Sequence, residues 1–77
     1  MKAYQVRICA ILNALDSCRW ALTADDLCFM LRMENHEYDQ STIRADLHFL
    51  KEIDSVTAED AVRQDGRAVK KWRRKKV

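Results

Sequence analysis

The first half of the chain carries apolar residues with a helical period. Between Tyr4 and Leu15 they fall at positions 4, 8, 11, 12 and 15, with polar residues between them. This spacing follows the 3.6-residue repeat of an amphipathic helix. The sequence therefore predicts a first helix over residues 4–15, followed by a connection over residues 16–22 in which the period breaks.

A second helix is expected from about residue 24 to Arg32. Thr23 is a favourable N-cap residue, and Asp25 and Asp26 place negative charge in the first turn, where the helix dipole stabilises it. The side chains expected to face the core are Leu27, Met30 and Leu31. Residues 33–39 are largely polar and follow no period, so they are expected to form a loop.

A third helix is expected over about residues 41–52. Asp39 or Ser41 can cap its N-terminus. Its apolar residues at i, i+4 and i+7 are Ile43, Leu47 and Leu50. Asp46 lies on the inner side of this helix, and we interpret it as a structural residue that bonds to backbone or to a basic side chain.

From Ser55 onward the pattern changes to an extended one, and Asp65-Gly66 is a two-residue hairpin turn signal. The sequence predicts a hairpin with strands near 55–63 and 68–74, in which Trp72 covers the core against the first helix. The competing interpretation is a short helix over residues 58–64 that ends at Gly66. The expected fold class is α+β, with three helices followed by a C-terminal β-hairpin.

This arrangement resembles a winged helix-turn-helix domain, and within that class the N-terminal DNA-binding module of DeoR-like transcriptional repressors. The matching residues are Thr23, Asp26 and Leu27 on the second helix, Thr42, Ile43, Arg44, Asp46 and Leu47 on the third, and Leu50 and Ile53 after them. Two features depart from that family. The loop before the third helix is longer than the family's tight turn, and Ala45 stands where the family has a second arginine.

The resemblance implies that the third helix reads DNA bases in the major groove and that the hairpin, the wing, contacts the backbone or the minor groove. The residues expected to read bases are Gln40, Ser41, Thr42, Arg44 and His48. The residues expected at the backbone or in the wing are Lys51, Arg63, Gln64, Arg67, Lys70, Lys71, Arg73 and Arg74. Residues 1–74 would form the domain and residues 75–77 a basic tail. For Arg44 and His48 the alternative is a solvated outer face without a ligand.

Charge is divided unevenly along the 77 residues, although the formal net charge is only +2. Residues 1–62 carry six basic and eleven acidic residues, a net charge of −5, whereas residues 63–77 carry eight basic residues and one acidic residue, a net charge of +7. A strongly basic end predicts binding to a polyanion.

Several classes of protein are disfavoured. No apolar run exceeds five residues, so neither a membrane span nor a signal peptide is expected. Cys9, Cys18 and Cys28 match no disulfide framework and no zinc-site spacing, which predicts free thiols in a reducing cytoplasm, with Cys9 and Cys28 in the core. No nucleophile signature or phosphate-binding glycine loop is present, so we expect neither enzymatic activity nor a cofactor or metal.

The sequence thus favours a sequence-specific, double-stranded DNA-binding transcriptional regulator, a repressor that occupies a promoter. It is expected in the cytoplasm, associated with the nucleoid when bound to DNA. A homodimer is possible, through the first helix or residues 18–22. One alternative is a winged-helix module that inhibits or recruits a protein partner. The other is an accessory protein that binds nucleic acid without sequence preference.

Overall fold

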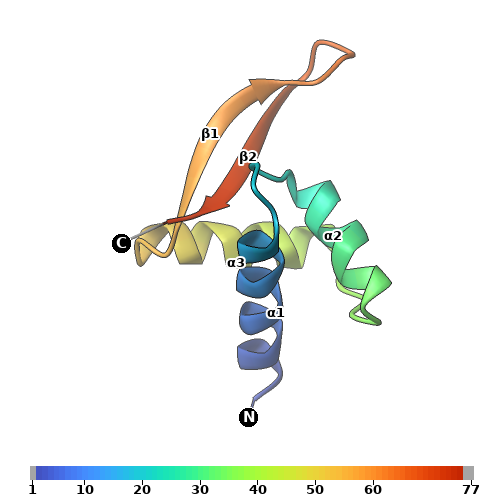
Figure 1. Cartoon of the computed structure of the whole chain (residues 1–77), viewed down its shortest axis with the longest axis vertical. Helices are drawn as coiled ribbons and strands as arrows, with labels where there is room; N and C mark the ends of the chain where they lie inside the picture. The colour runs from blue at the N-terminus through green and yellow to red at the C-terminus, as the bar shows by residue number, and fades with distance from the viewer. Residues whose placement is uncertain (1, 76–77) are drawn as a thin grey trace.

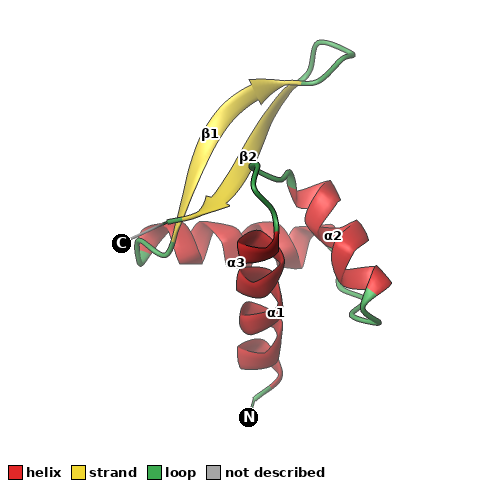
Figure 2. Cartoon of the chain, in the orientation of Figure 1, coloured by secondary structure: helices red, strands yellow, loops and turns green. Residues whose placement is uncertain are grey.

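The computed structural model describes residues 2–75, which form three helices followed by an antiparallel hairpin (Figure 1, Figure 2). The elements are α1 (Ala3–Ser17), α2 (Ala24–Met33), α3 (Gln40–Glu52), β1 (Val56–Val62) and β2 (Ala68–Arg74). The predicted α+β class and element order are confirmed, and the alternative helix over 58–64 is wrong. No helix in this part of the chain is long and apolar enough to cross a bilayer. The last two residues of the expected basic tail, Lys76 and Val77, lie outside the described residues.

The core lies where the three helices meet the base of the hairpin. Its fully buried side chains are Ile11, Leu27, Leu31, Ile43, Leu47, Leu50 and Val56. The inward-facing positions predicted for α3 are confirmed. Of the three predicted for α2, Leu27 and Leu31 are confirmed. Met30 is only half-buried, and Tyr4 is 52% exposed. Tyr4 is exposed because the first turns of α1 extend past the other elements, as Figure 1 shows at the N-terminus.

The N-terminus of α2 is fixed by a capping box. Thr23 Oγ1 accepts a hydrogen bond from the backbone N–H of Asp26 at 3.1 Å, and Asp26 Oδ2 accepts one from the backbone N–H of Thr23 at 3.1 Å. These two bonds satisfy amides that have no partner within the helix. The predicted N-cap is therefore confirmed. Asp39 occupies the N-cap position of α3, but its side chain makes no capping hydrogen bond.

Both α2 and α3 end in a left-handed residue that is not glycine. Asn35 and Asp54 each have φ of 66°. The amide of His36 donates to the carbonyl of Leu31 at 2.8 Å, and the amide of Ser55 donates to that of Leu50 at 2.8 Å. These are the six-to-one hydrogen bonds of Schellman motifs. They turn the chain sharply into the 34–39 loop and into β1.

The hairpin turn differs from the two-residue turn predicted from Asp65-Gly66. The last strand pair is Val62 with Ala68, and the amide of Gly66 donates to the carbonyl of Arg63 at 2.9 Å. A two-residue type I′ turn needs positive φ at both central residues, but Gly66, at 87°, has the only positive φ in the turn. The connection is therefore a longer turn that ends in a left-handed glycine.

A bridge ties the hairpin to the connection between α1 and α2. The amide of Leu22 donates to the carbonyl of Trp72 at 2.9 Å, and the amide of Trp72 donates to the carbonyl of Leu22 at 2.7 Å. From the sequence, Leu22 was expected only to belong to a connection in which the helical period breaks, and no pairing was predicted for it. The bridge holds the middle of β2 beside the N-terminus of α2, so it fixes where the wing lies relative to the helices.

Candidate nucleic-acid interface

A cleft lies between the N-terminus of α2, the outer face of α3 and the hairpin. Its volume is about 460 Å³. Its lining residues are Ala24, Asp25, Gln40, Arg44, His48, Arg63, Arg67, Ala68, Val69, Lys70 and Trp72. Four of these are basic and one is acidic, so the lining carries a formal net charge of +3. Pockets that bind small molecules are mostly apolar. A lining with this net positive charge is better suited to the phosphate backbone of a nucleic acid.

Three of the five α3 residues expected to read bases line this cleft. Gln40, Arg44 and His48 lie at i, i+4 and i+8, a spacing that places them along one helix face. Ser41 is exposed and Thr42 is half-buried, and neither is among the lining residues. The base-reading role of all five stays a prediction, but the first three share one surface with the wing.

His48 also connects α3 to the hairpin. Its ring meets that of Trp72 edge to face, with centroids 5.3 Å apart and planes at 88°. Trp72 is only 3% exposed, so its expected place in the core is confirmed. Aromatic pairs in this geometry add stability beyond the burial of their area. The contact therefore holds the wing base against the face of α3 that lines the cleft.

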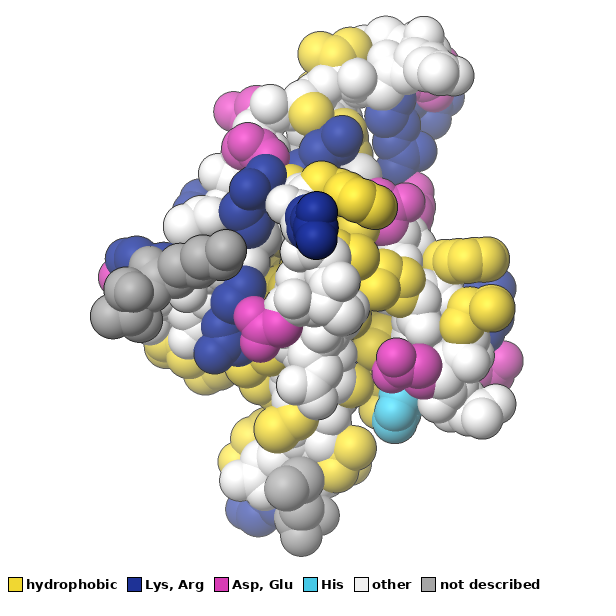
Figure 3. All heavy atoms as spheres, in the orientation of Figure 1, with side chains coloured by type: hydrophobic (Ala, Val, Ile, Leu, Met, Phe, Trp, Pro, Cys, Tyr) yellow, Lys and Arg dark blue, Asp and Glu magenta, His cyan; other side chains and the backbone are white. Residues whose placement is uncertain are grey.

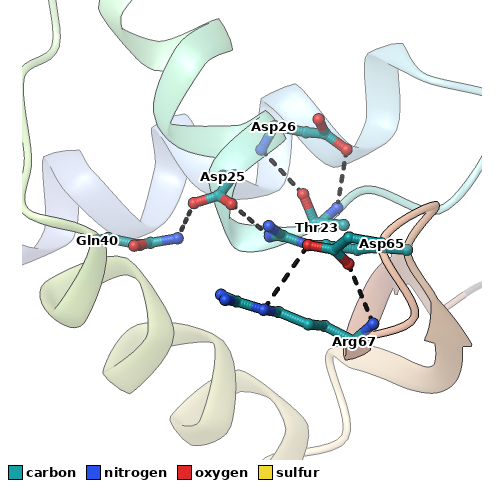
Figure 4. Close-up of polar contacts among 7 residues, drawn as sticks. Thr23, Asp25, Asp26, Gln40, Asp65 and Arg67 are labelled. Atoms are coloured by element: carbon teal, nitrogen blue, oxygen red, sulfur yellow. Dashed lines mark hydrogen bonds and ion pairs between the residues drawn. The ribbon is translucent and has the colours of Figure 1, made fainter.

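The hairpin contributes three basic side chains to the cleft, all of them expected in the wing. Arg63 and Arg67 flank the turn, and Lys70 lies in β2. The Arg67 side chain is 81% exposed, and Figure 4 shows it extending from the hairpin toward α3. The cleft therefore has cationic groups on both of its walls, from α3 and from the wing.

The other basic and polar residues expected at a nucleic-acid backbone do not line the cleft. Gln64 and Lys71 border a separate depression beside the N-terminus of α2. Lys51 is exposed in the last turn of α3, Arg73 is exposed in β2, and Arg74 is half-buried. Their contacts with DNA stay a prediction, and this surface would meet a duplex only outside the cleft.

Acidic residues of β1 partly neutralise the basic strand β2. The Lys70 ammonium lies 3.6 Å from the Asp60 carboxylate, and the Arg73 guanidinium lies 3.8 Å from that of Glu59. Figure 3 shows the resulting mixture of basic and acidic side chains along the hairpin. The net charge of +7 counted over residues 63–77 therefore overstates the free positive charge of the wing, because the strand register brings acids from outside that range beside it.

Asp25 lines the cleft, although from the sequence it was expected only to stabilise the N-terminus of α2 through the helix dipole. Its Oδ1 accepts a hydrogen bond from Gln40 Nε2 (Figure 4). Its Oδ2 forms an ion pair with Arg63. One carboxylate thereby contacts α3 and the wing. No spacing in the sequence indicates this, since its two partners lie 15 and 38 positions away.

Asp46 faces away from the cleft and anchors α3 to α1. Its carboxylate accepts two hydrogen bonds from the Arg7 guanidinium, one of them from Nη2 at 3.0 Å. Asp46 is 8% exposed. Hydrogen bonding to this carboxylate raises the pKa of Arg7 above its usual value. The structural interpretation of Asp46 is supported, and the partner is the basic side chain that the sequence left unnamed.

The cysteines form no site of their own. All three are free, but Cys9 is exposed and Cys28 half-buried, so the expected core position of Cys9 is wrong. Cys9 borders an open depression between α1 and α3, together with Asp46 and Phe49. Burial raises the pKa of the Cys28 thiol. Within residues 2–75, no three His, Cys, Asp or Glu side chains are placed to hold a metal ion.

Comparisons with known proteins support the fold. No family model matches the chain. No curated protein matches it either. Among solved structures, the chain is similar to a PadR-like transcription factor from Bacteroides fragilis, with a TM-score of 0.76 over 94% of this chain and 72% of that one, at 20% sequence identity. This likeness shows a winged-helix fold and gives no support to the narrower DeoR-like resemblance.

Proposed function

We propose that this protein binds double-stranded DNA in a sequence-specific way and regulates transcription as a repressor. The observation that carries the proposal is the cleft of net charge +3, in which α3 and the wing present their basic side chains to the same space. The solved structure with the same fold is named a transcription factor. A winged helix with a cationic surface between its third helix and its wing has the shape and the charge that suit binding to double-stranded DNA.

In this proposal α3 enters the major groove with Arg44 on the groove floor. Arginine pairs well with guanine through two hydrogen bonds, and glutamine pairs in the same way with adenine. Arg44 is exposed, and it has no carboxylate within ion-pair distance among residues 2–75. Its guanidinium is therefore free to donate to a base edge, while Gln40 supplies the second base contact.

The wing would hold the sugar-phosphate backbone beside the groove. Arg67 and Lys70 line the cleft wall opposite α3, and their charged groups are exposed. Contacts to phosphate fix the orientation of a protein on DNA and add affinity, but they carry no sequence information. The wing therefore supplies binding strength, and α3 supplies the choice of sequence.

Selection from a random duplex pool at about 150 mM salt tests this division of roles. The wild type and Arg44→Ala are compared, with Lys51→Ala as a control that removes an exposed α3 cation outside the cleft. We expect one enriched motif for the wild type, relaxed at one base position in Arg44→Ala and unchanged in Lys51→Ala. Tight binding without an enriched motif would instead support the accessory protein that binds any nucleic acid.

The expected homodimer belongs to the same proposal, because paired half-sites raise affinity through effective concentration. Both surfaces named from the sequence carry exposed aromatic rings, since Tyr4 on α1 is 52% exposed and Trp20 in the 18–22 segment is 66% exposed. Sedimentation of the wild type against Trp20→Ser and Tyr4→Ser identifies which surface pairs. A monomer at every concentration would remove the dimer from the proposal.

A further inference from the structure

Asp25 is unusual among the cleft residues because it carries the opposite charge to its neighbours. Of the described residues that line the cleft it is the only acidic one, and it lies where α2, α3 and the wing meet. Its carboxylate is about half exposed, at 48%. Asp25 is not needed to cap α2, since Thr23 and Asp26 do so without it. The helix dipole alone gives no reason for two side chains from other elements to converge on it.

We propose that Asp25 is a specificity-determining residue that weakens binding to DNA of arbitrary sequence and orients Gln40 for base reading. The inference rests on the proposed DNA-binding function and deepens it. It assigns to one carboxylate both a repulsive and an orienting role in the cleft. Discrimination between ligands often depends on such a repulsive element as well as on attractive contacts.

The repulsive role follows from the ion pair with Arg63. A phosphate that approaches Arg63 must also approach the Asp25 carboxylate, and like charges at close range repel. Exposed ion pairs are individually weak, so a phosphate can displace the carboxylate. The displacement costs the same for every base sequence, so it lowers the affinity for all duplexes. Only a duplex that gains base contacts on α3 offsets it.

The orienting role follows from the chemistry of a carboxylate. An ionised carboxylate only accepts hydrogen bonds, so it must face the amide nitrogen of Gln40 and not the amide oxygen. This leaves Gln40 Oε1 and the second N–H of Nε2 without a partner from Asp25. One acceptor and one donor are what an adenine edge requires in the major groove. Asp25 therefore selects the amide orientation in advance of binding.

Asp25→Asn separates these effects from folding, because asparagine keeps the shape and can still hydrogen-bond Gln40. Asp16→Asn is the matched control, since it removes the same charge from the last turn of α1, outside the cleft. Both variants and the wild type are titrated with the selected duplex and with a scrambled duplex between about 50 and 200 mM salt. Thermal unfolding of each protein verifies that it is folded.

We expect Asp25→Asn to bind the scrambled duplex roughly 3- to 10-fold more tightly at about 50 mM salt, with a salt slope steeper by about one, because Arg63 gains a phosphate contact. The lost repulsion strengthens both duplexes alike, but the ratio of selected to scrambled affinity should fall for a second reason. The new amide can turn either its oxygen or its nitrogen toward Gln40, so it no longer selects the Gln40 orientation that reads adenine. Asp16→Asn should change that ratio by less than about twofold, because its charge lies outside the cleft and salt screens it. In an Arg63→Gln background the gain from Asp25→Asn should disappear.

Three results would overturn the inference while leaving the proposed function intact. The first is that Asp25→Asn and Asp16→Asn change the affinity for the scrambled duplex equally. The second is that Asp25→Asn leaves the ratio of selected to scrambled affinity unchanged. The third is that Asp25→Asn still strengthens binding to the scrambled duplex in the Arg63→Gln background. Failure of the proposed function has a different signature. In that case the wild type yields no selected motif or binds no duplex at all, and the inference fails with it.

Discussion

Arg44 and Asp46 lie two positions apart on α3 but have opposite surroundings. Residues two apart on a helix point about 200° away from each other. Arg44 consequently lies on the cleft, and Asp46 is 8% exposed against α1. The sequence predicted both orientations from the α3 period. It did not predict that Arg7 is the partner of Asp46, because that contact spans 39 positions.

The Arg7 and Asp46 pair should contribute measurably to stability. We expect Asp46→Asn to lower the free energy of unfolding by about 1 to 2 kcal/mol, because it weakens two charge-assisted hydrogen bonds that are largely shielded from water. Urea unfolding of Asp46→Asn, Arg7→Gln and the double variant measures the coupling. Additive losses in the double variant would show that the pair contributes nothing of its own.

The thiols should react in the order of their exposure. Cys9 is exposed, whereas Cys28 is half-buried and burial raises its pKa, which lowers the fraction of reactive thiolate that Cys28 forms at neutral pH. We expect iodoacetamide to label Cys9 first and Cys28 more slowly, with the rate at Cys28 rising as the pH is raised toward and above its pKa. Mass spectrometry of peptides at several pH values checks this, and faster labelling of Cys28 would contradict the burial of its side chain.

At the scale of elements, the helices were predictable because each buries its own apolar stripe, and the hairpin followed from its extended pattern and Asp65-Gly66. The bridge from Leu22 to Trp72 was not predictable, because a single extended residue has no period of its own. The cleft could not be predicted for the same reason, since it depends on contacts between residues far apart in the sequence. Its walls are held together by the bridge, by the His48 and Trp72 contact and by Asp25, and no local pattern encodes these contacts.

The C-terminus of α2 provides a prediction about the stability of a single helix end. Asn35 holds a left-handed conformation, which costs energy for any residue with a Cβ and costs asparagine less than most. We expect Asn35→Gly to raise the free energy of unfolding by about 0.5 kcal/mol and Asn35→Ala to lower it by about 1 kcal/mol. Denaturant unfolding of the two variants provides the test. Equal stabilities would mean that the Schellman motif does not form in solution.

At the scale of the whole molecule, charge is arranged so that most of the surface is not a general polyanion binder. Acidic residues of β1 sit beside β2, and the rest of the chain is acidic overall. The net positive lining of the cleft stands out against this background. If the proposed function holds, a duplex that docks elsewhere would meet mixed charge, so this arrangement would favour one orientation on DNA over many.

This arrangement predicts a modest salt dependence. In the proposed complex Arg67 and Lys70 contact phosphates, while Arg44 contacts a base and the charge of Arg63 is offset by Asp25. The logarithm of the binding constant should therefore fall with the logarithm of salt concentration with a slope of about −2. Fluorescence anisotropy with a labelled duplex between about 50 and 200 mM salt measures it. A slope near −7 would mean that all eight basic residues of the 63–77 segment contact DNA and that the pairing with β1 is lost on binding.

The most direct test of the account is an NMR titration of the 77-residue chain with its selected duplex, in which the amide of each residue is followed. We predict that the largest shifts cluster on α3 between Gln40 and His48 and on the hairpin between Arg63 and Lys70, with little change on the outer faces of α1 and α2. Shifts confined to residues beyond Lys70, with α3 unaffected, would contradict the claim that α3 and the wing bind DNA together.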